Sequence, residues 1–314
     1  MMANEHPDTG VAGKKRIDEP TGTEFVGHEW DGIEELDTPM PRWWLWCLYA
    51  SIVWGIVYVI LYPAWPMFER ATEGTLGWTS RGELAQDMSL ADEERASFRA
   101  QLARVPTERL SGNPEVMQQA IAGGHAAFKV NCVQCHGSGA AGSQVLGYPN
   151  LADDDWLWGG DLQAIEYTIK HGIRQQGHAE TRNGAMPPFA GVIEGEQLTA
   201  LVGHVMSLSG SGTANAVGAE LYNINCTSCH GANGQGDREQ GAPSLADAIW
   251  LYGNSPAQIE RQILAPRMGV MPNWQGRLDP VTIKMLAAYV HSLGGGEDFV
   301  EAAADPVVET DEQR

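Results

Sequence analysis

The apolar positions begin with one long uncharged run from Trp43 to Tyr62. A helix of about 20 residues spans about 30 Å, which is the thickness of a bilayer's hydrocarbon core. Tryptophans cluster at the start of the run and tyrosines lie near its end, as in interfacial aromatic belts, and Pro63 and Pro66 follow. A long polar segment precedes the run and no small-residue cleavage site follows it. The pattern therefore predicts an uncleaved transmembrane helix over 43–62.

Beyond this anchor the apolar residues recur with helical spacing. Leu84 to Val105 is charged and amphipathic, which predicts one or two surface helices. Leu198, Leu201, Val205 and Leu208 mark one face of a further helix. Strand-like alternation is missing from the second half of the chain. The expected fold class is therefore all-α, with one N-terminal transmembrane helix before the helical domains.

The second half of the chain contains two copies of one sequence repeat. With an offset of 94 residues, Phe128 to Ile169 match Tyr222 to Ile263, and after Ile173 the offset falls to 85, so that Met186 matches Met271. The first copy therefore carries nine extra residues between Ile173 and Met186. The repeat predicts tandem domains, and the rest of the chain divides around them: 1–42 acidic N-terminal segment, 43–62 anchor, 63–115 linker with helices, 116–210 domain 1, 211–296 domain 2, 297–314 acidic C-terminal tail.

Charge is concentrated at the two ends. The chain has a formal net charge of −20, most of it carried by residues 1–41 and 297–314. We expect residues 1–38 and the C-terminal tail to be mostly unstructured and solvated. The stretch from His28 to Arg42, with Trp30, Ile33 and Leu36, is expected to lie against a membrane surface or a partner. This acidic balance argues against nucleic-acid binding.

Each repeat carries one C-x-x-C-H motif: Cys132, Cys135 and His136 in the first, and Cys226, Cys229 and His230 in the second. This spacing is typical of covalent haem c attachment, in which both thiols form thioethers with one porphyrin and the histidine binds its iron. A structural zinc site would leave the histidines surplus, and a thioredoxin-type pair would need a βαβ pattern that is absent here. The motifs predict two covalently bound haems c.

Methionine is the expected sixth ligand of each iron, because a His/Met pair leaves no open coordination position and suits electron transfer. Met186 and Met271 each precede a proline, which favours an extended loop across a haem face. Met206, Met268 and Met285 are rival candidates, and His171 and His178 are expected to be exposed or near the propionates. By default each methionine serves its own domain, although closely packed domains could exchange these loops.

The domains resemble class I cytochromes c, and the whole arrangement resembles the dihaem subunit III of cbb3-type cytochrome c oxidases. The motifs that carry this resemblance are Trp30-Asp-Gly-Ile-Glu-Glu-Leu, Pro39-Met-Pro-Arg-Trp-Trp44, Tyr62-Pro-Ala-Trp-Pro66, Pro149-Asn-Leu, Asp154-Asp-Trp-Leu-Trp-Gly159, His171-Gly-Ile-Arg174, Met186-Pro-Pro and Arg267-Met-Gly-Val-Met-Pro272.

The resemblance implies an electron-transfer subunit of a terminal oxidase that does not itself reduce O₂. Its implied partners are a monohaem cytochrome c subunit and a haem–copper catalytic subunit, with a soluble or membrane cytochrome c as donor. Two alternatives stay open. One is an electron-transfer subunit of another membrane dehydrogenase or nitrogen-oxide reductase, and the other is a dihaem peroxidase.

Thioether attachment in bacteria takes place outside the cytoplasmic membrane. We therefore expect an inner-membrane protein with a cytoplasmic N-terminus and periplasmic haem domains, an orientation that Lys14, Lys15, Arg16 and Arg42 before the anchor also favour. Cys47, Ser51 and Gly55 form a stripe of small residues along the anchor, which would let a partner helix approach closely. Cys47 is otherwise a small apolar filler.

Overall fold

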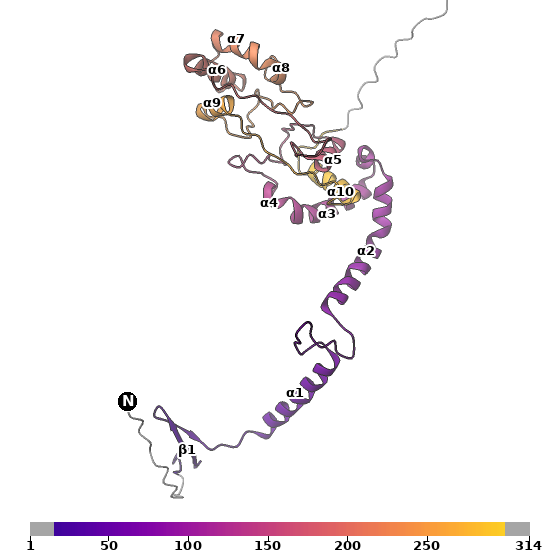
Figure 1. The fold of residues 1–314 in the computed structure, drawn as a ribbon, viewed down its shortest axis with the longest axis vertical. Helices are drawn as coiled ribbons and strands as arrows, with labels where there is room; N and C mark the ends of the chain where they lie inside the picture. The colour runs from indigo at the N-terminus through magenta and orange to yellow at the C-terminus, as the bar shows by residue number, and fades with distance from the viewer. Residues whose placement is uncertain (1–15, 299–314) are drawn as a thin grey trace, which may run out of the picture. The chain divides into compact units, whose positions relative to one another are not determined.

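The computed structural model describes residues 16–298 of the 314-residue chain. It divides into two compact units, one ending at Asp92 and one beginning at Glu93 (Figure 1). The acidic residues 1–15 and 299–314, for which we expected solvated tails, lie outside the described residues.

The first unit contains a β-hairpin where the sequence predicted no regular structure. Strand β1 (Phe25–Trp30) pairs antiparallel with β2 (Ile33–Leu36), and Trp30 lies opposite Ile33. The two connecting residues, Asp31 and Gly32, both have positive φ, at 51° and 82°. A two-residue hairpin turn of this kind favours an Asp-Gly pair. The prediction that 1–38 is mostly unstructured is therefore wrong for residues 25–36.

Helix α1 (Arg42–Leu61) is the predicted anchor, displaced by one residue. It begins directly after Pro41, and none of its residues is buried. Among the described residues it is the one helix that is long and apolar enough to cross a membrane. Cys47 lies exposed on this helix. Helix α2 spans Ser80–Arg104 as a single helix, where we expected one or two helices.

The second unit is helical, as the sequence predicted. Its elements are η1 (Thr107–Gly112), α3 (Pro114–Asn131), α4 (Val133–His136), α5 (Leu162–His171), α6 (Gly195–Leu208), α7 (Ala216–Asn225), α8 (Thr227–His230), α9 (Pro256–Leu264) and α10 (Pro280–His291). Each repeat thus has the same order: a helix leading into the C-x-x-C-H turn, a middle helix, and a last helix after the Met-Pro loop.

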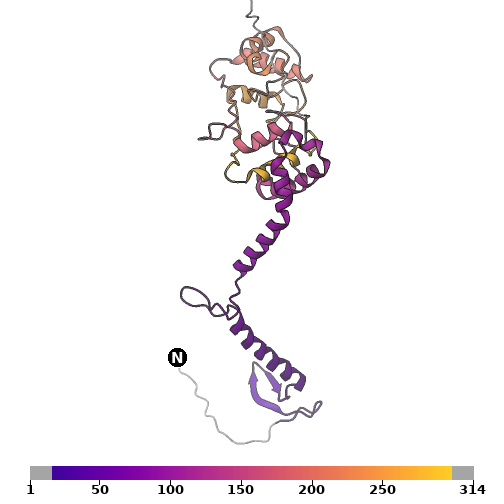
Figure 2. The ribbon, with the colours of Figure 1, turned by 90° about the vertical axis from the view of Figure 1, so that its right-hand side faces the viewer.

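The helices of the two repeats are interleaved. The last helix of the second repeat, α10, packs along the first helix of the first repeat, α3, and α6 packs in the same way on α7. In Figure 1, α3, α5 and α10 lie together and α6, α7 and α9 lie together. Figure 2 shows the yellow α10 again beside the purple-magenta part of the chain. The sequence units 116–210 and 211–296 therefore each supply helices to both groups.

Three clusters of buried residues result from this packing. The first core cluster is Phe128, Ala140, Ile165, Ile169, Ile283, Leu286, Ala287 and Val290. The second core cluster is Ile193, Leu198, Leu201, Val202, Val205, Tyr222, Ile259 and Ile263. A supporting cluster joins the end of α2 and η1 to α3 and α10: Leu102, Leu110, Val116, Ala120, Leu162, Met285 and Ala288.

Glycine makes both helix crossings possible. A Cβ atom on Gly124 of α3 would overlap the Met285 carbonyl of α10, and one on Gly218 of α7 would overlap the Ala200 carbonyl of α6. The two glycines occupy equivalent positions in the repeat. An aromatic ring lies against each crossing: Tyr289 beside Phe128, and His204 beside Tyr222, with ring centroids 5.2 Å apart in both cases. The two crossings are therefore built in the same way.

Candidate haem sites

The first C-x-x-C-H motif forms a tight helical turn at the end of α3. Cys132 caps α3 and starts α4, and Gly137, with φ of 77°, ends it. The second motif repeats this geometry, from Cys226 to Gly231 with φ of 76°. The turn places two thiols and one imidazole of each motif on a single short stretch of helix, as attachment to one edge of a porphyrin requires.

The imidazole of each motif is held in the form that binds a metal. His136 Nδ1 lies 3.4 Å from the Pro149 carbonyl oxygen, and His230 Nδ1 lies 3.0 Å from that of Pro243. A carbonyl oxygen only accepts, so Nδ1 carries the proton and Nε2 keeps its lone pair for a metal. Burial lowers the pKa of both histidines, and the backbone hydrogen bond opposes this only in part. Both rings are therefore neutral at neutral pH.

A largely apolar cavity opens beside the first motif. Residues of both repeats line it, including Cys132, Cys135, His136, Trp156, Ile165, Ile169, Tyr252, Met271, Trp274 and Leu286. Burial raises the pKa of the Cys132 thiol to about 11, with a smaller contribution from Cys135, and the pKa of Cys226 is raised to about 11 for the same reasons. Two thiols, one imidazole and one thioether around an apolar space fit a haem c.

Each candidate methionine packs against the same core cluster as a cysteine of the other repeat's motif. Met271 lines the cavity of Cys132 and His136, and its backbone pairs in both directions with Ile173, at 2.9 and 3.0 Å. Met186 packs against the second core cluster together with Cys226. Phe189, three residues later, donates its N–H to the Ile263 carbonyl at 3.1 Å. These placements favour an exchange of loops over the default expectation that each methionine serves its own domain.

The rival methionines occupy other places. Met285 is buried in the supporting cluster, where it contacts α3. Met268 is 44% exposed and is not among the residues that line the first cavity. Met206 lies on α6 and packs on the second core cluster, which also contains Met186. Among the described residues, Met271 is thus the methionine that lines the first cavity.

A pair of reciprocal contacts joins the two repeats between the sites. The Tyr252 ring of the second repeat covers Gly147 of the first, and the Trp158 ring of the first covers Gly241 of the second. These are equivalent positions at the offset of 94. The guanidinium carbon of Arg267 lies 5.0 Å from the Tyr252 ring centroid, and that of Arg182 lies 5.3 Å from the Trp158 ring centroid. The two aromatic–glycine contacts, each with an arginine beside its ring, are therefore related as in a two-fold arrangement of the repeats.

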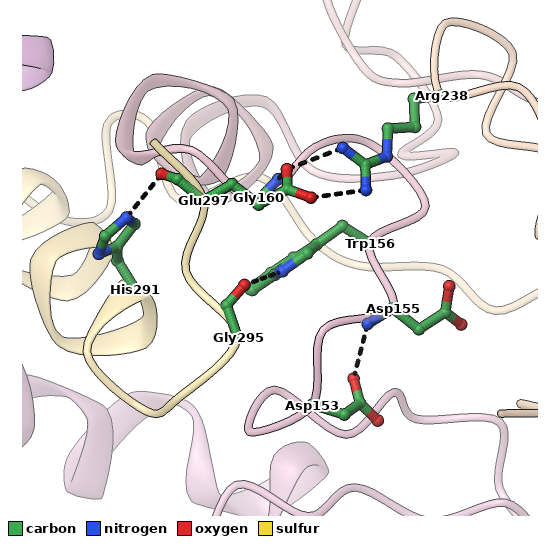
Figure 3. A network of polar contacts seen from close by, with 8 residues as sticks. All are labelled: Asp153, Asp155, Trp156, Gly160, Arg238, His291, Gly295 and Glu297. Carbon is green, nitrogen blue, oxygen red and sulfur yellow. Dashed lines mark hydrogen bonds and ion pairs between the residues drawn. The ribbon is translucent and has the colours of Figure 1, made fainter. Parts of the chain in front are cut away.

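The segment after α10 adds a polar connection (Figure 3). The Glu297 carboxylate accepts hydrogen bonds from both terminal nitrogens of Arg238, at 2.8 and 2.6 Å, and from the Gly160 N–H at 2.8 Å. Trp156 Nε1 donates to the Gly295 carbonyl oxygen at 2.5 Å. The sequence placed Glu297 in a solvated tail, and this residue is instead part of the fold.

Sequence reasoning also missed two features of the cavity surroundings. Asp155 lines the first cavity, and burial together with Asp247 and Asp153 raises the pKa of its carboxyl to about 6. His171 is 2% exposed, so the expectation that it is exposed is wrong, and it is not among the residues that line the first cavity. His178 lies beside it.

Two family models match this chain. Residues 22–69 match the family described as the N-terminal domain of cytochrome oxidase-cbb3, FixP. Residues 119–205 and 213–290 match the family described as cytochrome c oxidase, cbb3-type, subunit III. The chain is 48% identical over 299 residues to the cbb3-type cytochrome c oxidase subunit FixP of Sinorhizobium medicae, covering 94% of this chain and 100% of that protein. It is 47% identical over 289 residues to subunit CcoP of Cereibacter sphaeroides, covering 90% and 98%.

Proposed function

This chain belongs to the subunit III family of cbb3-type cytochrome c oxidases, and from that membership we propose how it serves as the membrane-anchored cytochrome c subunit of such an oxidase. It binds two haems c, one through Cys132 and Cys135 and one through Cys226 and Cys229. His136 and Met271 bind the first iron, and His230 and Met186 bind the second. Electrons pass through these haems toward the monohaem and haem–copper subunits of the complex.

The observation that carries the proposal is the pairing of each C-x-x-C-H motif with a methionine from the other repeat. When bound, each haem supplies one-electron chemistry. The chain's own residues hold the two sides of the iron, exclude water with the apolar core clusters, and fix the imidazole tautomer through Pro149 and Pro243. A histidine and a methionine would hold each haem iron and leave no position open for O₂, so the chain would carry electrons and leave O₂ reduction to another subunit.

Helix α1 would anchor the chain in the inner membrane, with residue 42 on the cytoplasmic side and the haem units in the periplasm. Covalent haem attachment outside the cytoplasmic membrane supports this orientation. The partners would be the other oxidase subunits, and the donor a cytochrome c. If that donor is basic, the acidic excess on the periplasmic side should steer its association, so the on-rate should fall as salt rises. Residues 1–42 carry −6 of the formal net charge of −20, which leaves −14 for residues 43–314.

The test uses the complex purified through a tag on this chain. We expect two covalent haem additions by mass spectrometry, and one after Cys226→Ala and Cys229→Ala are combined. Membranes without the chain should keep the oxygen-reducing centre but oxidise reduced cytochrome c slowly. Unchanged cytochrome c oxidation at every donor concentration would contradict the electron-entry role. Peroxide turnover by the isolated subunit would instead favour a peroxidase.

A further inference from the structure

The nine-residue insertion of the first repeat places two potential metal ligands next to a third potential ligand on α5. It lies between Ile173 and Met186 and carries His178 and Glu180. Both side chains turn back to His171 at the end of α5. The second repeat has neither the insertion nor a histidine at the position equivalent to His171. The three residues therefore form a cluster that the haem sites do not explain.

The geometry of this cluster is that of a metal-ligand set. His171 Nδ1 lies 2.9 Å from His178 Nε2 and 3.4 Å from Glu180 Oε2, and all three ligand atoms lie within 4.8 Å of one another. Two ligands at tetrahedral angles around Zn²⁺, with bonds of about 2.0–2.1 Å, are about 3.3 Å apart. Small side-chain movements would therefore place the three atoms around one ion.

The surrounding contacts hold the ligands in place. The Tyr167 ring lies on His171 with centroids 4.4 Å apart, and its hydroxyl donates to the Glu180 carbonyl oxygen at 2.9 Å. The base of the insertion is closed by Arg174 N–H to the Arg182 carbonyl at 2.8 Å and by Arg182 N–H to the Gly172 carbonyl at 3.1 Å. A ligand set that is already ordered loses little entropy on binding, which favours affinity.

We propose that His171, His178 and Glu180 bind one divalent transition-metal ion of the Zn²⁺ or Cu²⁺ class, with water completing the coordination. Imidazole and carboxylate are ligands that such ions prefer. The nearby Lys170 and Arg182 are positive, so the Glu180 carboxylate is the charge that favours the cation. Arg182 is engaged elsewhere, donating to Thr168 Oγ1 at 2.9 Å.

The ion would fasten the insertion close to the first haem site. None of its three ligands lines the first cavity, so the metal site is separate from that of the haem. Ile173, two residues after His171, forms the backbone pair with Met271. A bound ion would tie the insertion to the end of α5, next to the segment that holds this methionine.

The test is a titration of Zn²⁺ into the full chain with its haems attached and any affinity tag removed. We expect one tightly bound ion per chain. His178→Ala and Glu180→Gln should each weaken the affinity at least about tenfold, which corresponds to the loss of one ligand interaction of about 1.4 kcal/mol. Glu196→Gln, at an exposed glutamate on α6, is the matched control and should bind as the wild type does.

X-ray absorption at the zinc edge gives an independent readout. The wild type should show two imidazole nitrogens with oxygen ligands, and His178→Ala should show one imidazole fewer. The proposal is overturned if the chain binds no stoichiometric zinc, or if His178→Ala and Glu180→Gln bind it as tightly as the control does. Both variants change residues at the surface loop rather than in the core clusters, and retained haem absorbance would verify that they fold.

Discussion

The two core clusters are assembled from equivalent parts, but only the first is supported by a third cluster among the described residues. Both have a glycine at the helix crossing, an aromatic pair beside it and a methionine loop from the other repeat. The first cluster alone shares α3 and α10 with the supporting cluster, where Lys284 Nζ donates to the carbonyls of Leu102 and Val105 at 3.2 and 2.7 Å.

This difference shows that two copies of a repeated sequence unit can have different surroundings in the folded protein. The backbone and the ligand-bearing motifs repeat, whereas the insertion with His178 and the cover provided by α2 and η1 belong to one site. Stability and haem potential depend on burial and on neighbouring charge. The two sites should therefore differ in both properties even though their predicted ligands are the same.

Removing a methionine should have the largest effect, and it distinguishes crossed from uncrossed ligation. In the Cys226→Ala/Cys229→Ala background, which keeps only the first haem, Met271→Leu should abolish the methionine–iron charge-transfer band and lower the haem potential, because a thioether favours ferrous iron. Met186→Leu is the matched control and should leave both unchanged. Optical spectra and redox titration measure the outcome. Loss of the band in Met186→Leu instead would show that each methionine serves its own repeat.

This crossing is also the part of the site that sequence could not decide. The repeats have similar apolar faces, so α10 can satisfy the same burial pattern on α3 or on α7. The pairing depends on tertiary geometry and on the connecting segments rather than on the composition of any one helix. Sequence placed the cysteines, the histidines and both methionine loops on the correct local elements, but it left their pairing across the repeats open.

Other elements differ in how strongly the sequence signals them. The anchor was predicted to within one residue, because an apolar run of bilayer length is a strong pattern. The hairpin at Asp31-Gly32 was missed although its turn signal is present, because acidic residues surround it. The cluster of His171 and His178 depends on how an inserted loop folds back, and local periodicity carries no such information.

Filling the helix crossings tests whether both helix pairs approach as closely as the structure shows. Gly124→Ala and Gly218→Ala each force a Cβ into a backbone carbonyl, and we expect a loss of about 1–3 kcal/mol in the free energy of unfolding. Gly203→Ala on α6 is the matched control, because its Cβ meets no atom closer than 3.5 Å. It should be neutral or stabilising, since alanine favours a helix by about 1 kcal/mol over glycine. Denaturant unfolding gives the values, and equal stability of all three variants would contradict the close crossing.

Asp155 should make the potential of the first haem depend on pH. Burial first, then Asp247 and Asp153, raise the pKa of its carboxyl to about 6. As pH rises through this value, Asp155 becomes negative and favours ferric iron, so the potential should fall, by less than the roughly 59 mV that corresponds to a tenfold coupling in a one-electron couple. Asp155→Asn should remove this dependence in redox titrations between pH 5 and 7.5.

The matched control for this prediction is Asp154→Asn, which changes an exposed neighbour. It should keep the pH dependence and move it slightly to lower pH, because Asp154 is the smallest of the charges that raise the pKa of Asp155. A dependence that persists in Asp155→Asn, or that disappears in Asp154→Asn, would assign the proton to a different group. The second haem serves as an internal reference, because Asp155 lines the cavity of the first motif.

The smallest expected effect concerns the ion pair between Glu297 and Arg238 (Figure 3). The pair connects the segment after α10 to the loop that follows the second C-x-x-C-H motif, so it links elements of the two sites. Its side chains are 31% and 54% exposed, which limits its contribution to about 1 kcal/mol at most. Glu297→Gln and Arg238→Gln should each reduce the free energy of unfolding by less than this amount.

A double-mutant cycle separates the pair from its surroundings. If the ion pair itself stabilises the fold, Glu297→Gln combined with Arg238→Gln should cost less than the sum of the single changes, and 1 M salt should reduce that coupling. Glu73→Gln is the matched control, because its pair with Arg70 is exposed at both ends, at 71% and 78%, and should contribute little. Additive single changes would mean that Glu297 acts instead through the Gly160 N–H, which it also accepts, at 2.8 Å. Glu297 would then hold the backbone of the first repeat at Gly160, and the charge of Arg238 in the second repeat would contribute nothing.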